Sequence, residues 1–377
     1  MTNLLPNYGR LPFALVKGEN TTLTDDVGND YLDFTSGIGV MNMGYSFEDG
    51  KNAVKAQLDV LSHMSNLYQN PLQEEVAEKL SYGGTYKAFF CNSGTEANEA
   101  AIKLVRLIKP GKKILAMNNG FHGRTFGAMS ATMQEKIQAG FAPLVPDFTS
   151  CDYNDVTSLD KAVKTGNIAA IMVECIQGEG GVLPMTQEFA DALKTYQSQG
   201  ILLVVDEVQT GIGRTGTLFA FEQFGLQPDI FTAAKALGNG IPTGAMLTLD
   251  KYAEIFSAGK HGSTFGGNPL AMAQANAVLS NLTEEFLTEV RQKSNIFLTE
   301  LSKSLSNKAS VKKIQGIGLM IGIVLADETK LSEDLSKLRE QGLLALSAGH
   351  DVIRLLPPLV MSEQQLSAGI KILEEVL

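Results

Sequence analysis

The chain of 377 residues contains no tryptophan, four histidines and three cysteines. The cysteines, Cys91, Cys151 and Cys175, form no CxxC pair and are odd in number, which fits a reducing cytoplasm better than a disulfide scaffold. The histidines do not have metal-ligand spacing with each other or with the cysteines. We therefore predict a cytoplasmic protein without a metal centre.

Long charged and long apolar runs are also missing. The net charge is −10, and the absence of a basic run argues against nucleic acid or an anionic membrane as a partner. Residues 1–13 lack the basic and apolar regions of a signal peptide, and no apolar run reaches membrane-spanning length. With 44% hydrophobic and 19% charged residues, the composition is typical of a soluble globular enzyme.

What the sequence does contain is an alternation of short aliphatic runs and longer amphipathic stretches. This alternation predicts βαβ units and an α/β fold with a mostly parallel, helix-covered sheet. The length of the chain favours a large domain with a smaller one beside it. We place a large α/β domain at 46–270 and a smaller α+β domain at 1–45 and 271–377. A hairpin near 15–35, a strand pair at 311–325 and a terminal helix capped by Ser362 belong to the smaller one. Strands are expected at 86–92, 112–119, 168–176, 201–208, 229–234 and 244–249.

Residues that directly follow the strands are the candidates for chemistry, because ligands of α/β sheets bind beyond the carboxyl ends. After the first strand, Ser93 and Glu96 have capping-box spacing, which indicates a well-capped helix. The same turn could hold a phosphate on the N–H groups of Gly94 and Thr95. Asp206 ends an aliphatic strand, where it either caps the next turn or serves as an anion under a heterocyclic cation.

Two further positions extend this pattern. Lys235 lies among small apolar residues after the next strand, either as a surface-turn lysine or as a desolvated nucleophile. In the stretch NNGFHGRTFG, Phe121 offers a flat face and Arg124 a fork suited to a carboxylate. A phosphate cradle, a buried carboxylate, an aromatic plate and a desolvated lysine together match pyridoxal 5′-phosphate. Neither GxGxxG after the first strand nor a GxSxG elbow is present.

Seven motifs along nearly the whole chain resemble the class III aminotransferases of fold type I: NSGTEANEA, FHGRT, ECIQGEGG, VVDEVQTGIGRTG, AAKALGNG, HGSTFGGNPLA and VIRLLPPL. The resemblance implies that Lys235 carries the cofactor covalently and then moves the substrate proton. It implies that Asp206 pairs with the pyridinium nitrogen and that Phe121 stacks on the ring. The other cofactor contacts that it implies are Gly94, Thr95, Glu207, Val208, Gln209 and Thr264, the last from the other subunit of a homodimer.

The resemblance also implies two carboxylate sites. Arg124, with Ser263 of the partner chain, corresponds to the arginine for the substrate α-carboxylate, and Arg354 to the arginine for glutamate. Glu179 corresponds to a gate that pairs with Arg354 for one substrate and swings away for the other. Without the family, Glu179 and Arg354 could equally form an ordinary surface pair.

The implied activity is transfer of the δ-amino group between N2-acetylornithine and 2-oxoglutarate, a reaction of arginine biosynthesis. Ile38 stands where ornithine aminotransferases carry a tyrosine, which favours an acetylated α-amine, while Cys175 replaces a frequent proline and is not expected to alter the chemistry. One alternative is an aminotransferase of the same class with another amino donor, such as succinylornithine, succinyl-diaminopimelate, ornithine or 4-aminobutyrate. Two others are an intramolecular isomerase, glutamate-1-semialdehyde aminomutase, and a protein that binds the cofactor without turnover.

Overall fold

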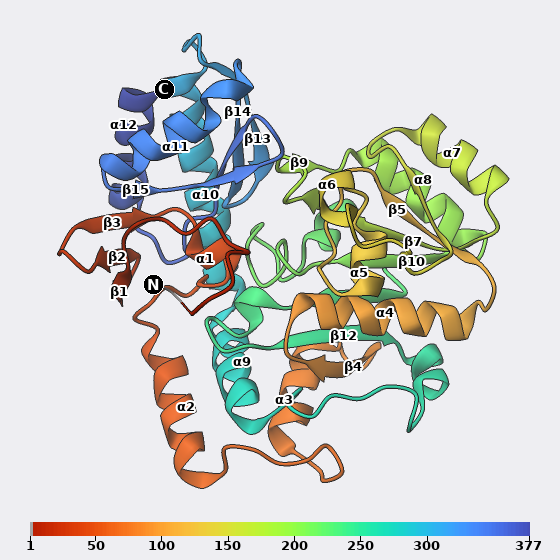
Figure 1. Cartoon of the computed structure of the whole chain (residues 1–377). Helices are drawn as coiled ribbons and strands as arrows, with labels where there is room; N and C mark the ends of the chain where they lie inside the picture. Colours follow the sequence, from red (N-terminus) through yellow and green to blue (C-terminus); the bar gives the residue numbers. More distant parts are fainter. Residues whose placement is uncertain (1–2) are drawn as a thin grey trace.

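The computed structural model describes residues 3–377, and within them the central layer is a seven-stranded sheet of order β4-β12-β11-β10-β7-β5-β6 (Figure 1). Six of its strands run in the same direction and only β12 runs against them, which confirms the predicted helix-covered, mostly parallel α/β fold. The strands are β4 (Tyr86–Cys91), β5 (Lys113–Met117), β6 (Phe148–Cys151), β7 (Ile168–Glu174), β10 (Leu202–Asp206), β11 (Ile230–Ala233) and β12 (Gly244–Leu249).

Two features of this sheet differ from the sequence prediction. β12 runs antiparallel to both of its neighbours, β11 and β4, although it reads as another buried parallel strand. The reason is the short connection after β11, because a parallel crossover needs about a dozen residues or more and this segment contains only the 3₁₀ helix η2 (Lys235–Leu237). β6 was missed, since its partly polar sequence FTSC lacks the aliphatic signal of the other strands.

Helices cover both faces of the central sheet. The amphipathic helix α4 (Gly94–Ile108) buries its apolar side against one face, in a cluster that includes Leu104, Val105 and Met246. α8 (Gln187–Ser198) packs on the other face through Phe189. The remaining elements of this region are α2 (Glu48–Val60), α3 (Pro71–Leu80), α5 (Phe126–Ala131), α6 (Glu135–Gln138), α7 (Val156–Thr165), β8 (Ile176–Gln177), β9 (Leu183–Pro184), η1 (Ala220–Phe224) and η3 (Asp250–Phe256).

The two ends of the chain meet beside the central layer (Figure 1). The predicted N-terminal hairpin is present and pairs, through β3, in parallel with a short strand from the C-terminal part. The predicted strand pair at 311–325 and the helix capped by Ser362 are also present. The division into domains at residues 45 and 270 stays a prediction. These elements are β1 (Leu15–Glu19), β2 (Thr22–Asp25), β3 (Asp30–Asp33), α1 (Ser36–Gly39), α9 (Pro269–Asn281), α10 (Glu284–Leu305), β13 (Val311–Ile317), β14 (Met320–Leu325), η4 (Glu328–Lys330), α11 (Leu331–Glu340), β15 (Leu343–Leu344), β16 (Leu346–Ala348), β17 (Val352–Leu355) and α12 (Glu363–Val376).

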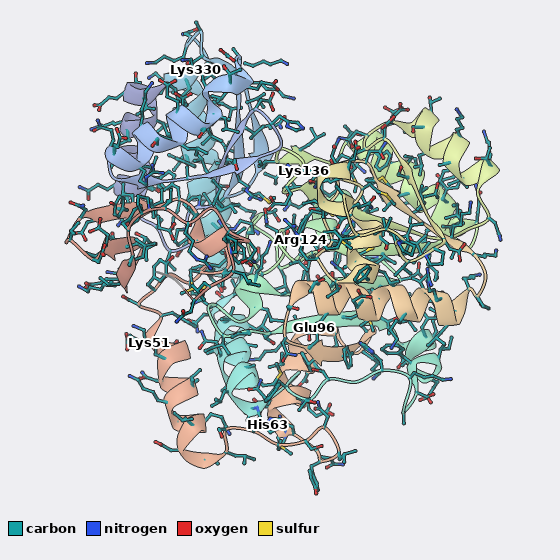
Figure 2. All side chains as sticks on the ribbon, viewed as in Figure 1. Lys51, His63, Glu96, Arg124, Lys136 and Lys330 are labelled. Atoms are coloured by element: carbon teal, nitrogen blue, oxygen red, sulfur yellow. The ribbon has the colours of Figure 1, made fainter. Side chains whose placement is uncertain are left out.

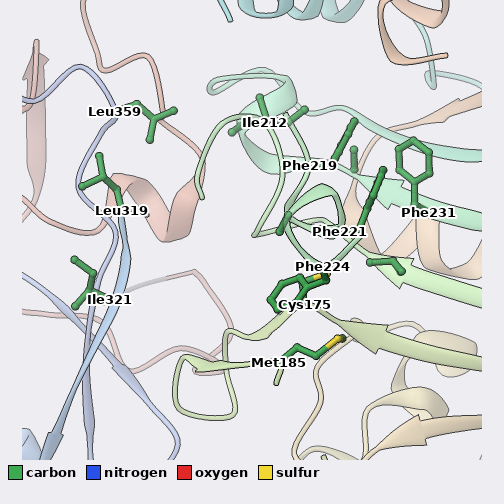
Figure 3. Close-up of a cluster of buried hydrophobic side chains, with 14 of the residues drawn as sticks. Cys175, Met185, Ile212, Phe219, Phe221, Phe224, Phe231, Leu319, Ile321 and Leu359 are labelled. Carbon is green, nitrogen blue, oxygen red and sulfur yellow. The ribbon is translucent and has the colours of Figure 1, made fainter. Parts of the chain in front are cut away.

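A continuous apolar core joins the central layer to the C-terminal elements. Figure 3 shows Phe219, Phe231 and Cys175 of the central region in the same buried cluster as Ile321 and Leu359. The Phe219 and Phe231 rings meet edge to face with centroids 4.8 Å apart. Throughout residues 3–377, no helix has the length and apolarity needed to cross a bilayer. No group of acidic, histidine and cysteine side chains in the same residues is arranged to hold a metal ion.

Candidate active site

Asp206 ends β10 with its carboxylate buried at 4% exposure and held by three donors. Asn98 Nδ2 donates to its Oδ2 at 2.8 Å, His122 Nδ1 lies 2.7 Å from the same oxygen, and the Val208 N–H donates to Oδ1 at 3.0 Å. These three hydrogen-bond partners hold the buried carboxylate in a fixed orientation. One edge of the central sheet thus carries an oriented anion.

His122 and Glu174 surround this anion with two further buried titratable groups. Burial opposes the charged form of His122, but the hydrogen bond and charge of Asp206, with the charge of Glu174, leave its pKa above the usual 6.5. Glu174 lies level with Asp206 on the neighbouring strand β7. Burial raises the pKa of Glu174 to about 7, against the lowering effect of the His122 charge. The anion of Asp206 therefore faces an imidazole that favours protonation.

Lys235 begins η2, just beyond the end of β11, the strand next to β10. Burial, followed by the positive charge of Arg354, lowers the pKa of its amine to about 8, while Glu179 and Asp206 act in the opposite direction. The backbone of Lys235 has φ of +49°, in the left-handed region that residues with side chains rarely adopt. Such strain is typical of functional positions, and the lowered pKa makes the amine a usable nucleophile near neutral pH.

The N-terminus of α4 forms a cradle next to Asp206. Ser93 caps the helix by accepting from the Glu96 N–H. A Cβ on Gly94 would lie only 2.5 Å from Val208 Cγ1, so the turn packs against the segment after β10 in a way that requires glycine. The Thr95 and Thr125 hydroxyls are hydrogen-bonded at 2.8 Å beside the helix start. Oriented N–H groups, hydroxyls, a buried anion and a lowered-pKa amine fit the phosphate, pyridine nitrogen and aldehyde of pyridoxal 5′-phosphate.

Arg354 on β17 is buried at 3% exposure and pairs with the gate residue expected from the sequence. Its Nη1 lies 2.5 Å from Glu179 Oε1 and 3.2 Å from Gln209 Oε1. Its Nε is a buried nitrogen without a hydrogen-bond partner in the described part of the chain. Because Arg354 is buried, the pair is not an ordinary solvated ion pair on the surface. The Nε of its guanidinium is available to a further carboxylate.

Arg124 lies over the ring of Phe121, with 5.8 Å between the guanidinium carbon and the ring centroid. Both residues line a cavity of about 120 Å³ together with Glu179 and Lys136. Figure 2 labels the side chains of Arg124 and Lys136, which come from the segments around α5 and α6. The cavity therefore brings together Phe121, Arg124 and Glu179.

Ser263 and Thr264 lie on a different surface of the same chain. They line a larger cavity of about 1300 Å³ with His63, Leu67 and Phe89. Ser263 is fixed there, because its Oγ accepts from Asn92 Nδ2 at 3.1 Å and its carbonyl accepts from Asn66. A single chain thus does not bring these two residues to the small cavity beside Arg124.

Glu207 is a cofactor-contact prediction whose side chain points into the core. Its carboxylate accepts from the Thr210 hydroxyl at 2.5 Å and from the Phe221 N–H at 2.7 Å, and burial raises its pKa to about 7. The alternation of side chains at the end of a strand explains this, because Asp206 and Glu207 face opposite ways. Its hydrogen bonds therefore support the protein behind the site.

Three residues around Asp206 were not singled out in the sequence. Asn98 and His122 were present in the motifs NSGTEANEA and FHGRT, but neither directly follows a strand. Glu174 does end a strand, next to the strand that carries Asp206. The rule that ligands bind at the carboxyl ends of the strands, the strand-end rule, would therefore have found it in the motif ECIQGEGG.

Comparisons with known proteins show which family the whole chain resembles. The family model described as aminotransferase class III matches residues 5–377. The chain is 68% identical, over the full length of both proteins, to an acetylornithine aminotransferase of Lactococcus lactis. Among solved structures it is similar to the Toxoplasma gondii ornithine aminotransferase, with pyridoxal phosphate in partial occupancy at its active site (TM-score 0.94, 31% identity, 99% of this chain and 92% of that one). It also resembles an N-acetylornithine aminotransferase of Stenotrophomonas maltophilia (TM-score 0.85, 34% identity, coverage 98% and 96%).

Proposed function

This chain belongs to the class III aminotransferases, which use pyridoxal 5′-phosphate, and we propose that it moves the δ-amino group of N2-acetylornithine to 2-oxoglutarate. The products are N-acetylglutamate 5-semialdehyde and glutamate, in a reaction of arginine biosynthesis. The observation that carries the choice of substrate is the full-length identity of 68% to the Lactococcus lactis acetylornithine aminotransferase. We place the reaction in the cytoplasm.

The residues at the sheet edge have different roles toward the cofactor. When bound, the cofactor supplies an electron-withdrawing ring and an aldehyde that carries the amino group. Lys235 would hold that aldehyde, and its amine would serve as the base for the proton of the substrate carbon. Asp206 would lie against the pyridine nitrogen and favour its protonated form, and the three donors to Asp206 fix the orientation of its carboxylate. Gly94 and Thr95 hold the phosphate at the start of α4.

Two arginines allow one site to take two substrates of different length. Arg124 and Ser263 of the partner subunit bind the α-carboxylate of acetylornithine, and Phe121 stacks on the ring beside Arg124. Arg354 binds the α-carboxylate of glutamate when Glu179 leaves it. With acetylornithine, Glu179 stays on Arg354 and neutralises it, which is the pairing found at 2.5 Å. This division of roles is supported by the different partners of the two guanidinium groups, Phe121 for Arg124 and Glu179 with Gln209 for Arg354.

The function is tested with a panel of amino donors. The purified enzyme with 2-oxoglutarate is supplied with acetylornithine, succinylornithine, ornithine or 4-aminobutyrate, and glutamate formation is measured. We expect the highest kcat/KM with acetylornithine, and Lys235→Ala, which still binds the cofactor, should be inactive with every donor. A preference of about tenfold or more for ornithine or 4-aminobutyrate, equal to about 1.4 kcal/mol, would overturn the proposed substrate.

The two carboxylate sites are tested by exchanging arginines for alanine. Loss of a charged hydrogen bond costs about 1.5–3 kcal/mol, so each change should lower kcat/KM by about tenfold or more for its own substrate. Arg124→Ala should weaken the use of acetylornithine more than that of glutamate, and Arg354→Ala should do the opposite. Equal losses for both substrates in either variant would show that the two sites are wrongly assigned.

A further inference from the structure

Glu174 is a buried carboxylate, 8% exposed, to which the reaction described above gives no role. Its two oxygens accept hydrogen bonds from different parts of the site. Oε2 accepts from the N–H of Phe121, the residue assigned to the cofactor ring, at 3.0 Å. Oε1 accepts from the N–H of Gly178, the residue before the Glu179 gate, at 3.1 Å. One carboxylate thus spans the loop that carries the aromatic plate and the loop that carries the gate.

The same carboxylate faces His122 across a small space beside Gly120. A Cβ on Gly120 would lie 3.5 Å from His122 Nε2 and 3.6 Å from Glu174 Oε2, so both atoms border the position that the missing side chain leaves open. His122 Nε2 is a buried nitrogen without a hydrogen-bond partner within residues 3–377. On the other side of the ring, His122 Nδ1 lies 2.7 Å from Asp206. The imidazole therefore lies between two carboxylates.

We propose that Glu174 is a positioning residue that holds the Phe121 and Gly178 backbones together and keeps a charged His122 imidazole against Asp206. The inference rests on the proposed function, since it concerns the same site. Its physical basis is that a buried imidazolium needs more than one negative neighbour to offset its desolvation. The contact of His122 Nδ1 with Asp206 keeps the carboxylate aimed at the cofactor position. The other titratable groups facing Glu174 are Lys235, Tyr153 and Cys175, and the test leaves all three unchanged.

The test uses Glu174→Gln, which removes the charge and nearly keeps the shape. Because the chain has four histidines, the imidazole signal of His122 can be assigned by NMR with a His122→Gln variant. In the protein without cofactor, the midpoint pH of the His122 signal should fall in Glu174→Gln by about one unit or more. With cofactor, kcat should fall by at least about tenfold while KM for both substrates changes less than about threefold.

The matched control is Glu99→Gln. Glu99 is another carboxylate that accepts backbone N–H groups, from Gly127 at 2.8 Å and Ala128 at 3.1 Å, but it has no contact with His122 or Asp206. This variant should leave the His122 midpoint unchanged. If Glu174→Gln also leaves it unchanged, or if Glu99→Gln lowers it equally, the proposal is wrong.

The variant Glu174→Asp distinguishes the effect of the negative charge from the effect of side-chain length. It also replaces Glu174→Gln in the test if the glutamine variant does not fold. Its carboxylate keeps the charge but is too short to accept from both N–H groups. We expect a His122 midpoint close to that of the unchanged protein together with a loss of kcat of about tenfold, and full kcat would overturn the positioning role. The donor panel is measured on the enzyme without substitutions, so its result does not depend on these variants. The proposed function and the role of Glu174 can therefore be disproved separately.

Discussion

Lys235 combines a strained backbone with an amine whose positive charge is disfavoured by burial and by Arg354. The charge of Arg354 is in turn partly balanced by Glu179. Lys235 and the Glu179–Arg354 pair are therefore electrostatically linked within one chain. A change at the gate should be measurable at the lysine, even in the protein without cofactor or substrate.

This link gives a prediction for Arg354→Ala. The pKa of Lys235 lies at about 8, below the ordinary 10.5, so its amine becomes neutral and reactive as the pH rises through about 8. Removing the arginine deletes a charge that lowers this pKa and frees Glu179, which raises it, so the midpoint should move upward by at least about half a unit. The rate at which a neutral acylating reagent labels Lys235 in the cofactor-free protein, followed by mass spectrometry against pH, measures the midpoint. Arg124→Ala is the control and should leave it in place.

At the scale of elements, the strand-end rule accounts for what could be predicted of the site. Asp206 ends one aliphatic, buried strand and Lys235 lies just beyond the end of its neighbour, so the sequence places both at one sheet edge. His122 comes from a loop and Asn98 from the second turn of α4, and only the folded chain brings them to Asp206. The antiparallel direction of β12 also escaped prediction, because the aliphatic pattern of a buried strand is the same in either direction.

The turn at the start of α4 offers a prediction for Gly94→Ala. The added Cβ would lie 2.5 Å from Val208 Cγ1, so the cradle and the segment after β10 must move apart. Overpacking of this kind costs about 1–3 kcal/mol. We expect the cofactor-free protein to bind pyridoxal 5′-phosphate about tenfold or more weakly, as measured by equilibrium titration. Gly9→Ala, where nothing lies within 4 Å of the new Cβ, should bind as the unchanged protein does.

At the scale of the whole molecule, the chain closes on itself through contacts that sequence patterns do not encode. β15 pairs with β3 from the other end of the chain. Both strands are too short for their sequences to indicate which strand they pair with. The buried Arg214 likewise bonds to backbone carbonyls of Leu319 and Pro357, far away in the sequence. Local sequence patterns predicted the N-terminal hairpin, the strand pair at 311–325 and the terminal helix, but not α11 or β15 to β17. Their pairing depends on packing, which is a property of the complete fold.

The separation of Ser263 and Thr264 from Arg124 leads to a prediction about assembly. Both line the cavity near Leu67, which is 90% exposed, and they adjoin Phe265, which is 61% exposed. Large exposed apolar groups around such a cavity are typical of an interface. We propose a homodimer in which the segment 261–266 of each chain completes the site of the other.

Mixed dimers test whether the sites are shared. Lys235→Ala removes the nucleophile of one chain, and Thr264→Asp places a negative charge where the segment 261–266 would meet the cofactor phosphate of the partner. Each variant alone should form an inactive dimer. Refolded or co-expressed together, they should form a hybrid with one intact site, because the chain that keeps Lys235 receives an unchanged Thr264 from its partner. The hybrid, purified by two affinity tags, should recover about half of the activity per dimer, since one of two sites is intact. If each chain used its own Thr264, the hybrid would be as inactive as its parents.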